Sequence, residues 1–249
     1  MIPGRARPRA WTALVLGAAA LSTAPASAET SAKPAPRTQI VDGPCAGCRA
    51  VFPAGSEPAP LLVILHGDSG HGPADLLAAW ERHAASRDVA LLALQCPRDL
   101  GCKGSWWQWN GDPSWVAAQV DALAKRRPLD RERTWLAGWS GGASYMGLRA
   151  TALERAFAAL VYHGGGIPPR AGCSSDAPRG APVYFLVGTA NPLHSLAVRL
   201  REHHEACKDD VAWQVLPGAD HAAEWRALDA NGGRILDWLS KQRRAPSKG

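Results

Sequence analysis

Residues 134–142 read Thr-Trp-Leu-Ala-Gly-Trp-Ser-Gly-Gly, an apolar run that ends in a cluster of glycines around Ser140. A helical pattern follows over residues 141–152, so Ser140 stands where a strand turns directly into a helix. This is the setting of the G-x-S-x-G nucleophile elbow, in which glycines two residues before and after the serine relieve the crowding of a sharp turn. The pattern therefore predicts that Ser140 is a nucleophile and that the N–H group of Gly141 binds an oxyanion.

Strand-like and helix-like patterns alternate along the rest of the chain. The expected strands are residues 61–65, 89–94, 134–137, 158–162, 183–187 and 211–216, and the expected helices lie near residues 74–87, 114–126, 141–152, 193–206 and 222–240. Because the strands are apolar nearly throughout and helices separate them, they favour a mostly parallel sheet that helices cover on both faces. The sequence therefore predicts one α/β domain over residues 38–243, a length that suits a single domain of this class.

Residues 1–28 have the pattern of a secretory signal peptide. Three arginines within residues 5–9 precede an apolar stretch over residues 11–21, and Ala-Ser-Ala at 26–28 resembles a cleavage site. No apolar stretch reaches the length of about 20 residues that a membrane-spanning helix needs. We therefore expect a secreted or periplasmic protein without a membrane anchor.

Composition and charge limit the partners that we expect. Residues 29–37 are rich in Ala, Ser, Pro and Lys and are expected to form a disordered leader, and residues 244–249 a disordered tail. The net charge of +6 falls by three when the arginines of the predicted signal peptide are removed. So mild a charge, without a basic run that alternates with aromatic residues, does not indicate nucleic-acid binding. We expect a monomer with no nucleic-acid partner.

All six cysteines lie beyond the predicted signal peptide, and an even number of cysteines in an oxidising compartment favours disulfides. Proximity in the sequence favours the pairs Cys45–Cys48, Cys96–Cys102 and Cys173–Cys207. The segment 45–48 also has the spacing of a redox motif, but it does not open a helix after a strand. No second pair of Cys or His residues stands at the spacing of zinc ligands, so no metal is expected.

A histidine late in the chain is the expected partner of Ser140. His221 follows the strand 211–216 and precedes the last expected helix, which is where the general base stands when the chain order is serine, acid, histidine. His203 and His204 fall within an expected helix, and we expect both on its surface.

The acid of this order is expected after the strand 183–187, where Asn191 stands instead of a carboxylate. An amide in the place of the acid costs about 10⁴-fold in kcat in a serine triad. Three possibilities stay open. Asn191 orients His221 in a slower enzyme, or the protein has lost hydrolysis and only binds its ligand, or the carboxylate comes from elsewhere. The best substitute is Asp176, and the weaker substitutes are Glu205 and Asp220.

A second oxyanion donor is expected after the strand 61–65, where residues 66–70 read His-Gly-Asp-Ser-Gly. The backbone N–H group of Asp68 or Ser69 is the candidate. Residues 163–166 read His-Gly-Gly-Gly and have the letters of an oxyanion motif, but they follow Ser140, whereas the loop of that motif precedes the nucleophile.

His-Gly after an early strand, Gly-Trp-Ser-Gly-Gly at residues 138–142 and a late histidine together resemble the α/β-hydrolase superfamily over nearly all of the mature chain. The signal peptide, the cysteines and a tryptophan-rich loop are similar to those of secreted polyhydroxybutyrate-depolymerase-like and feruloyl-esterase-like serine esterases. The resemblance implies the α/β-hydrolase fold and a small or polymeric ester substrate, with no cofactor.

Tryptophans crowd one segment that follows Cys102. The chain has eleven tryptophans against three phenylalanines, and Trp106, Trp107 and Trp109 stand almost together. Indole rings offer a large rigid apolar surface with one polar group, so these side chains, Trp139 and His66 are candidates for substrate binding. About half of the tryptophans are expected to be wedges in the core instead.

These features predict a secreted serine hydrolase that cleaves carboxylic esters by two-step acyl transfer, with Ser140 as nucleophile and His221 as base. The triad does not choose between ester and amide, so a secreted serine peptidase of the same fold is one alternative. A catalytically silent protein that binds a carbohydrate or a polymer is the other.

Overall fold

Eight strands form one mixed sheet in the part of the chain that the computed structural model describes, which is residues 38–54, 57–68, 70–173 and 178–244. The predicted signal peptide, the predicted leader, Ser69, Asp176 and all but the first residue of the predicted tail lie outside these ranges. Among the described helices, none combines the length and the apolar character that crossing a membrane requires.

The strand order is β1-β2-β4-β3-β5-β6-β7-β8. The strands are β1 (Thr38–Asp42), β2 (Arg49–Pro53), β3 (Ala59–Leu65), β4 (Ala90–Leu94), β5 (Leu129–Trp139), β6 (Leu160–His163), β7 (Val183–Gly188) and β8 (Val211–Leu216). Every pair from β4 to β8 is parallel, whereas β1 and β2 form antiparallel pairs at one edge. The carboxyl ends of β3, β5, β6, β7 and β8 therefore meet at the same edge of the sheet, where an open α/β sheet binds its ligands.

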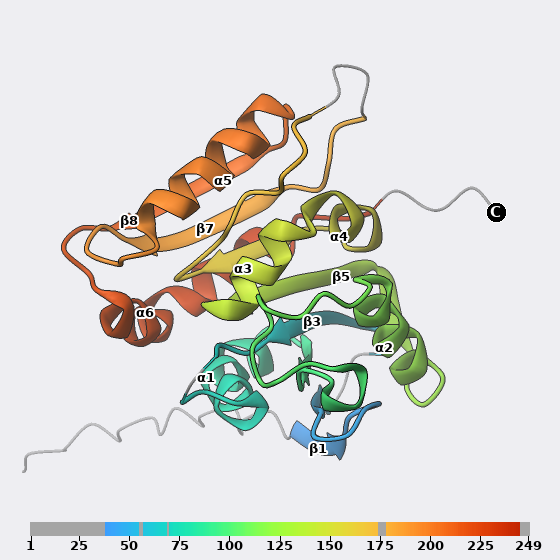
Figure 1. Ribbon diagram of the computed structural model, residues 1–249. Helices are drawn as coiled ribbons and strands as arrows, with labels where there is room; N and C mark the ends of the chain where they lie inside the picture. The colour runs from blue at the N-terminus through green and yellow to red at the C-terminus, as the bar shows by residue number, and fades with distance from the viewer. Residues whose placement is uncertain (1–37, 55–56, 69, 174–177, 245–249) are drawn as a thin grey trace, which may run out of the picture. The chain divides into compact units, whose positions relative to one another are not determined.

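Helices cover both faces of the sheet (Figure 1). They are α1 (Pro73–Ala85), α2 (Ser114–Ala124), α3 (Gly141–Leu148), α4 (Ala150–Ala156), α5 (His194–Ala206) and α6 (His221–Leu239), with a short 3₁₀ helix at Arg98–Leu100. Alternate residues of β3 point to opposite faces: Leu61, Val63 and Leu65 join the core under α2 to α5, and Leu62 and Ile64 join the core under α1 and α6. Apolar strands are thus buried on both sides, as the sequence predicts.

Two parts of the fold differ from the sequence prediction. The edge hairpin β1–β2 was not expected, because most of β1 is exposed and shows no apolar strand pattern. The helix expected over residues 141–152 is divided into α3 and α4 at Arg149, whose backbone leaves the helical region with φ −121° and ψ 18°. Neither difference moves Ser140 from the junction of β5 and α3.

The three cysteine pairs favoured by the sequence lie at disulfide distance. Their Cα–Cα separations are 5.2 Å for Cys45–Cys48, 5.8 Å for Cys96–Cys102 and 5.3 Å for Cys173–Cys207. The first pair closes the turn between β1 and β2, and the last joins the C-terminal end of α5 to the segment that follows β6.

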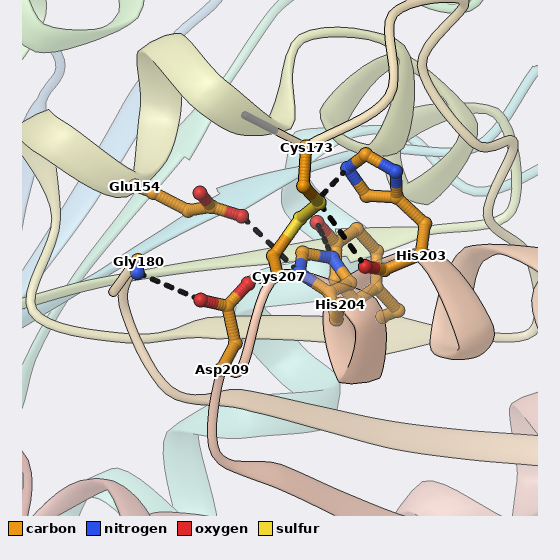
Figure 2. The surroundings of a disulfide bond; sticks show 8 residues. Glu154, Cys173, Gly180, His203, His204, Cys207 and Asp209 are labelled. Atoms are coloured by element: carbon orange, nitrogen blue, oxygen red, sulfur yellow. Dashed lines mark hydrogen bonds and ion pairs between the residues drawn. A yellow bond between two sulfur atoms is a disulfide. The ribbon is translucent and has the colours of Figure 1, made fainter. Parts of the chain in front are cut away.

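His204 lies beside the Cys173–Cys207 bridge and is fully buried, so the expectation of a surface position is wrong for this residue (Figure 2). Its Nδ1 atom is 2.9 Å from a carboxylate oxygen of Asp209 and 3.2 Å from one of Glu154. Burial lowers the pKa of His204, but the hydrogen bonds to Asp209 and Glu154 outweigh it and hold that pKa above its ordinary value. A helical pattern with two adjacent histidines does not show that one of them is buried against the carboxylates of Asp209 and Glu154.

Candidate active site

Ser140 occupies a strained turn between the end of β5 and the start of α3. Its backbone has φ 51° and ψ −109°, a conformation that residues other than glycine seldom adopt. A Cβ atom at Gly138 would lie 2.5 Å from the backbone nitrogen of Ala143, and one at Gly142 would lie 2.5 Å from the carbonyl oxygen of Leu65. Both glycines are therefore required for the close approach that holds the serine hydroxyl outward.

His221 lies next to Ser140 although 81 residues separate the two in sequence. Its Nε2 atom is 2.9 Å from the Oγ atom of Ser140. The structure makes His221 the first residue of α6 instead of a loop residue, and Asp220 caps the helix by accepting a hydrogen bond of 2.7 Å from the N–H group of Ala223. The helix cap thus fixes the point at which the imidazole leaves the backbone.

Asn191 also lies beside the histidine, at the turn after β7. Its Nδ2 atom is 3.2 Å from Nδ1 of His221, 3.1 Å from the carbonyl oxygen of Gly164 and 2.5 Å from a carboxylate oxygen of Glu224. Its Oδ1 atom accepts a hydrogen bond of 2.8 Å from the N–H group of Leu193. The residue in the expected acid position is therefore near the imidazole, but it also contacts a carboxylate.

That carboxylate belongs to Glu224, which the sequence analysis missed. Glu224 stands three residues after His221 in α6, is 0% exposed, and places its Oε2 atom 3.0 Å from Nδ1 of His221. Its Oε1 atom accepts a hydrogen bond of 2.5 Å from the N–H group of Gly188. Residues three apart on a helix are neighbours on its surface, so the spacing His-x-x-Glu is the signal that would have indicated this residue.

The other carboxylates proposed from the sequence do not contact His221 in the described residues. Glu205 forms an ion pair with Arg201 along α5, and Asp220 is occupied as the cap of α6. Asp176 lies outside the described residues, so its role stays a prediction.

His163 supports the first turn of α6 from the end of β6. Its Nε2–H group donates a hydrogen bond of 2.7 Å to the backbone carbonyl of Glu224. Burial lowers the pKa of His163 to about 4, so this imidazole is neutral near pH 7. The next residue, Gly164, has φ +63°, and a Cβ atom there would lie 3.0 Å from Oε2 of Glu224. The His-Gly-Gly-Gly stretch thus lies directly behind the site.

A cavity of about 540 Å³ opens at Ser140. Its lining consists of Asp68, His71, Trp139, Ser140, His221, Ala222, Trp225 and Arg226. The indole of Trp139 lies parallel to the His221 ring, with 4.5 Å between ring centroids and an angle of 6°. His71 and Trp225 stack on each other at 3.9 Å. Aromatic surfaces therefore form much of the wall beside the serine.

The tryptophan-rich segment does not contribute to this lining. Trp106 and Trp109 are 0% and 4% exposed, and they pack in the core with Trp115 and Tyr145. Trp107 is exposed but does not line the cavity at Ser140. Trp106 and Trp109 are therefore core residues and not substrate-binding residues.

The loop after β3 is only partly as expected. His66 is buried, its Nε2 atom accepts a hydrogen bond of 3.1 Å from the N–H group of Cys96, and burial lowers its pKa. This residue joins two strand ends and does not line the cavity. Asp68 does line it, and its carboxylate lies so close to Gly141 that a Cβ atom there would overlap it. The backbone N–H groups of Asp68, Ser69 and Gly141 remain predicted oxyanion donors.

No family model matches the chain. Acyl-protein thioesterase 1 of Gibberella zeae is 26% identical over 224 residues, which cover 72% of this chain and 90% of that protein.

Solved structures show the same architecture at low sequence identity. An S-formylglutathione hydrolase from Agrobacterium tumefaciens has a TM-score of 0.61 and 15% identity, with 85% of this chain and 97% of that chain covered. A fluorophosphonate-binding serine hydrolase from Staphylococcus aureus has a TM-score of 0.62 and 11% identity, with 82% and 98% covered. The chain therefore has the α/β-hydrolase fold predicted from its sequence, and it is similar to hydrolases and thioesterases of that fold.

Proposed function

We propose that this protein is a serine hydrolase that cleaves carboxylic esters through an acyl-enzyme intermediate. The observation that carries the proposal is the contact of 2.9 Å between Oγ of Ser140 and Nε2 of His221 at a strained elbow. A serine hydroxyl becomes a nucleophile when an adjacent base within such a distance removes its proton. The similarity to hydrolases of the same fold supports the same class of reaction.

The first half of the reaction acylates Ser140. His221 takes the proton of Oγ as the oxygen attacks the ester carbonyl carbon, and the carbonyl oxygen becomes an oxyanion. The N–H group of Gly141, at the start of α3, donates to that oxyanion, together with a backbone N–H group of Asp68 or Ser69. The intermediate collapses when the bond to the alcohol breaks and His221 gives its proton to the departing alkoxide oxygen.

The second half removes the acyl group by the same groups in reverse order. His221 takes a proton from a water molecule, whose oxygen attacks the acyl carbonyl carbon, and then returns the proton to Oγ of Ser140. The products are a carboxylic acid and the regenerated serine. No redox step and no external group transfer are needed.

The cavity supports a substrate with a flat or apolar part. Its volume of about 540 Å³ falls within the usual range for small-molecule sites, and the aromatic rings of Trp139, Trp225 and His71 form part of its wall. A thioester is the second substrate class to test, because the Gibberella zeae relative is named as a thioesterase. The signal-peptide pattern and the three cysteine pairs support a secreted or periplasmic location as part of the proposal.

A fluorophosphonate probe tests the proposal directly, because it reacts with activated serines. The wild-type protein should be labelled at Ser140 at neutral pH and should hydrolyse p-nitrophenyl butyrate, and the S140A variant should lose both properties. Absence of labelling and turnover in the folded wild-type protein would contradict the hydrolase function. Labelling without turnover of oxygen esters, but with turnover of a butyryl thioester, would assign the second substrate class.

A further inference from the structure

We infer that Glu224 is the carboxylate that orients His221, and that Asn191 positions Glu224 instead of serving in place of the acid. The inference rests on the proposed function, because it treats His221 as the general base. In the chain order expected for this fold the acid follows β7. Here an amide follows β7 and the carboxylate stands in the first turn of α6, so the carboxylate comes after the histidine in the sequence instead of before it.

The hydrogen bonds of Asn191 determine which way its amide points. The backbone N–H group of Leu193 can only donate, so the atom that it contacts at 2.8 Å is the amide oxygen. The amide nitrogen then faces the carbonyl oxygen of Gly164 and the carboxylate of Glu224, which both accept. Its two hydrogens are used by these two acceptors, and none is left for His221.

The hydrogen bonds of the Asn191 amide determine the tautomer of His221. The Nδ1 atom lies 3.2 Å from the amide nitrogen of Asn191, which has no hydrogen to give it, and 3.0 Å from the carboxylate of Glu224, which accepts. The hydrogen of the neutral ring is therefore on Nδ1 and is donated to Glu224. The unprotonated Nε2 atom faces the hydroxyl of Ser140, as a general base requires.

The surroundings of Glu224 suit a charged carboxylate. Three donors face its oxygens, namely the N–H group of Gly188, the amide of Asn191 and Nδ1 of His221. The side chain is fully buried, and within the described residues its ion-pair partner is His221. The charge is therefore available to stabilise the imidazolium that forms when Ser140 loses its proton.

Placing the acid in α6 also gives it a rigid connection to the base. His221 and Glu224 belong to one helical turn, which Asp220 caps and which His163 holds through the backbone carbonyl of Glu224. Asn191, at the turn after β7, then holds the Glu224 carboxylate with a neutral amide that donates a hydrogen bond to it. A carboxylate in both positions would bring two negative charges to 2.5 Å, so the amide is the partner that the helix-borne acid requires.

Three variants test the assignment, with kcat and KM measured for p-nitrophenyl butyrate. E224Q should lower kcat by about 10⁴-fold, because the glutamine amide donates to Nδ1 and imposes the wrong tautomer, and KM should change little. D229N is the matched control: it neutralises an exposed carboxylate of the same helix, which pairs with Arg82, so kcat should change by less than about twofold.

The double variant N191D/E224Q returns a carboxylate to the turn after β7 and places the amide on the helix. It should regain at least about tenfold in kcat over E224Q, because a carboxylate at position 191 can accept from Nδ1 and the amide at position 224 can donate to that carboxylate. A purely structural role of Glu224 predicts no such recovery.

The ¹⁵N chemical shifts of the His221 ring in the wild-type protein give a measurement that needs no variant. They should show a hydrogen on Nδ1 and none on Nε2 near pH 8. A hydrogen on Nε2, an E224Q variant within about tenfold of the wild-type kcat, or a D229N variant as slow as E224Q overturns the inference. If Ser140 of the wild-type protein is labelled normally by fluorophosphonate, any of these results contradicts only the role of Glu224. If the wild-type protein is not labelled, the proposed hydrolase function is itself contradicted.

Discussion

The carboxylate of Glu224 lies 3.0 Å from Nδ1 of His221, and the other nitrogen of the same ring lies 2.9 Å from the hydroxyl of Ser140. The histidine and the carboxylate therefore come from one helical turn, while the serine comes from the end of β5. Asn191, at the turn after β7, contacts both His221 and Glu224.

We expect N191D alone to lower both activity and stability. A second carboxylate would face that of Glu224 at 2.5 Å and would also face the carbonyl of Gly164, with no donor between them. Breaking a buried polar network in this way costs about 3 kcal/mol in the free energy of unfolding, measured by urea denaturation at pH 7. A rise in turnover would instead show that position 191 holds the acid of the triad, against our assignment.

Stability should fall on the acid side because of His163. Burial lowers its folded-state pKa to about 4, whereas the unfolded chain has the ordinary value of 6.5. Between these values the unfolded state binds a proton that the folded state does not, so stability is complete above pH 6.5 and is lost as the pH falls. The loss amounts to about 3 kcal/mol by pH 4.

The variant H163Q is the control for this pH dependence, because its amide nitrogen can still donate to the carbonyl of Glu224 but cannot titrate. Free energies of unfolding from urea curves at several pH values should fall less steeply for H163Q than for the wild type. Parallel curves would assign the acid sensitivity to other groups.

Trp225 and Trp107 differ in their position relative to the cavity at Ser140. Trp225 lines the cavity and stacks on His71, whereas Trp107 is exposed outside it. We expect W225A to raise KM for an aromatic ester by about tenfold with little change in kcat, because a stacked ring contributes about 1.5 kcal/mol to binding. W107A should leave both constants unchanged. A larger effect of W107A than of W225A would show that the tryptophan-rich segment binds the substrate.

The cysteine pairs should differ in their effect on stability. Cys173–Cys207 closes a loop of 34 residues, whereas Cys45–Cys48 closes one of three. Loop-closure entropy predicts a loss of about 4 kcal/mol for C173A/C207A and about 2 kcal/mol for C45A/C48A, measured by thermal or urea denaturation. Equal losses would indicate that the bridge beside His204 acts through native contacts and not through the unfolded chain.

Local sequence patterns predicted the turn that carries Ser140 and the parallel strands around it. A Cβ atom at position 138 or 142 would lie only 2.5 Å from a neighbouring backbone atom, and such crowding is typical of a strand that turns sharply into a helix. The alternation of apolar strands and helices predicted the parallel part of the sheet for a similar reason, since burial on both faces leaves a repeating signature. The edge hairpin β1–β2 left no such signature, because its outer strand is largely exposed.

The clustering of tryptophans in the sequence did not predict which of them line the cavity. Trp106 and Trp109 are buried against Tyr145, while Trp225, which stands apart in the sequence, lines the cavity. Indole rings serve equally well in a core and in a binding wall, so only their packing separates the two uses.

The sequence by itself determined the positions of Ser140 and His221 in the chain order, predicted the α/β-hydrolase fold, and favoured the three cysteine pairs that lie at disulfide distance. Only the tertiary structure decided which carboxylate lies behind His221. Chain order places a residue at the correct edge of the sheet, but a hydrogen bond depends on the directions of side chains from several elements. Asn191, Gly188 and His221 converge on Glu224 only when β7 and α6 pack together.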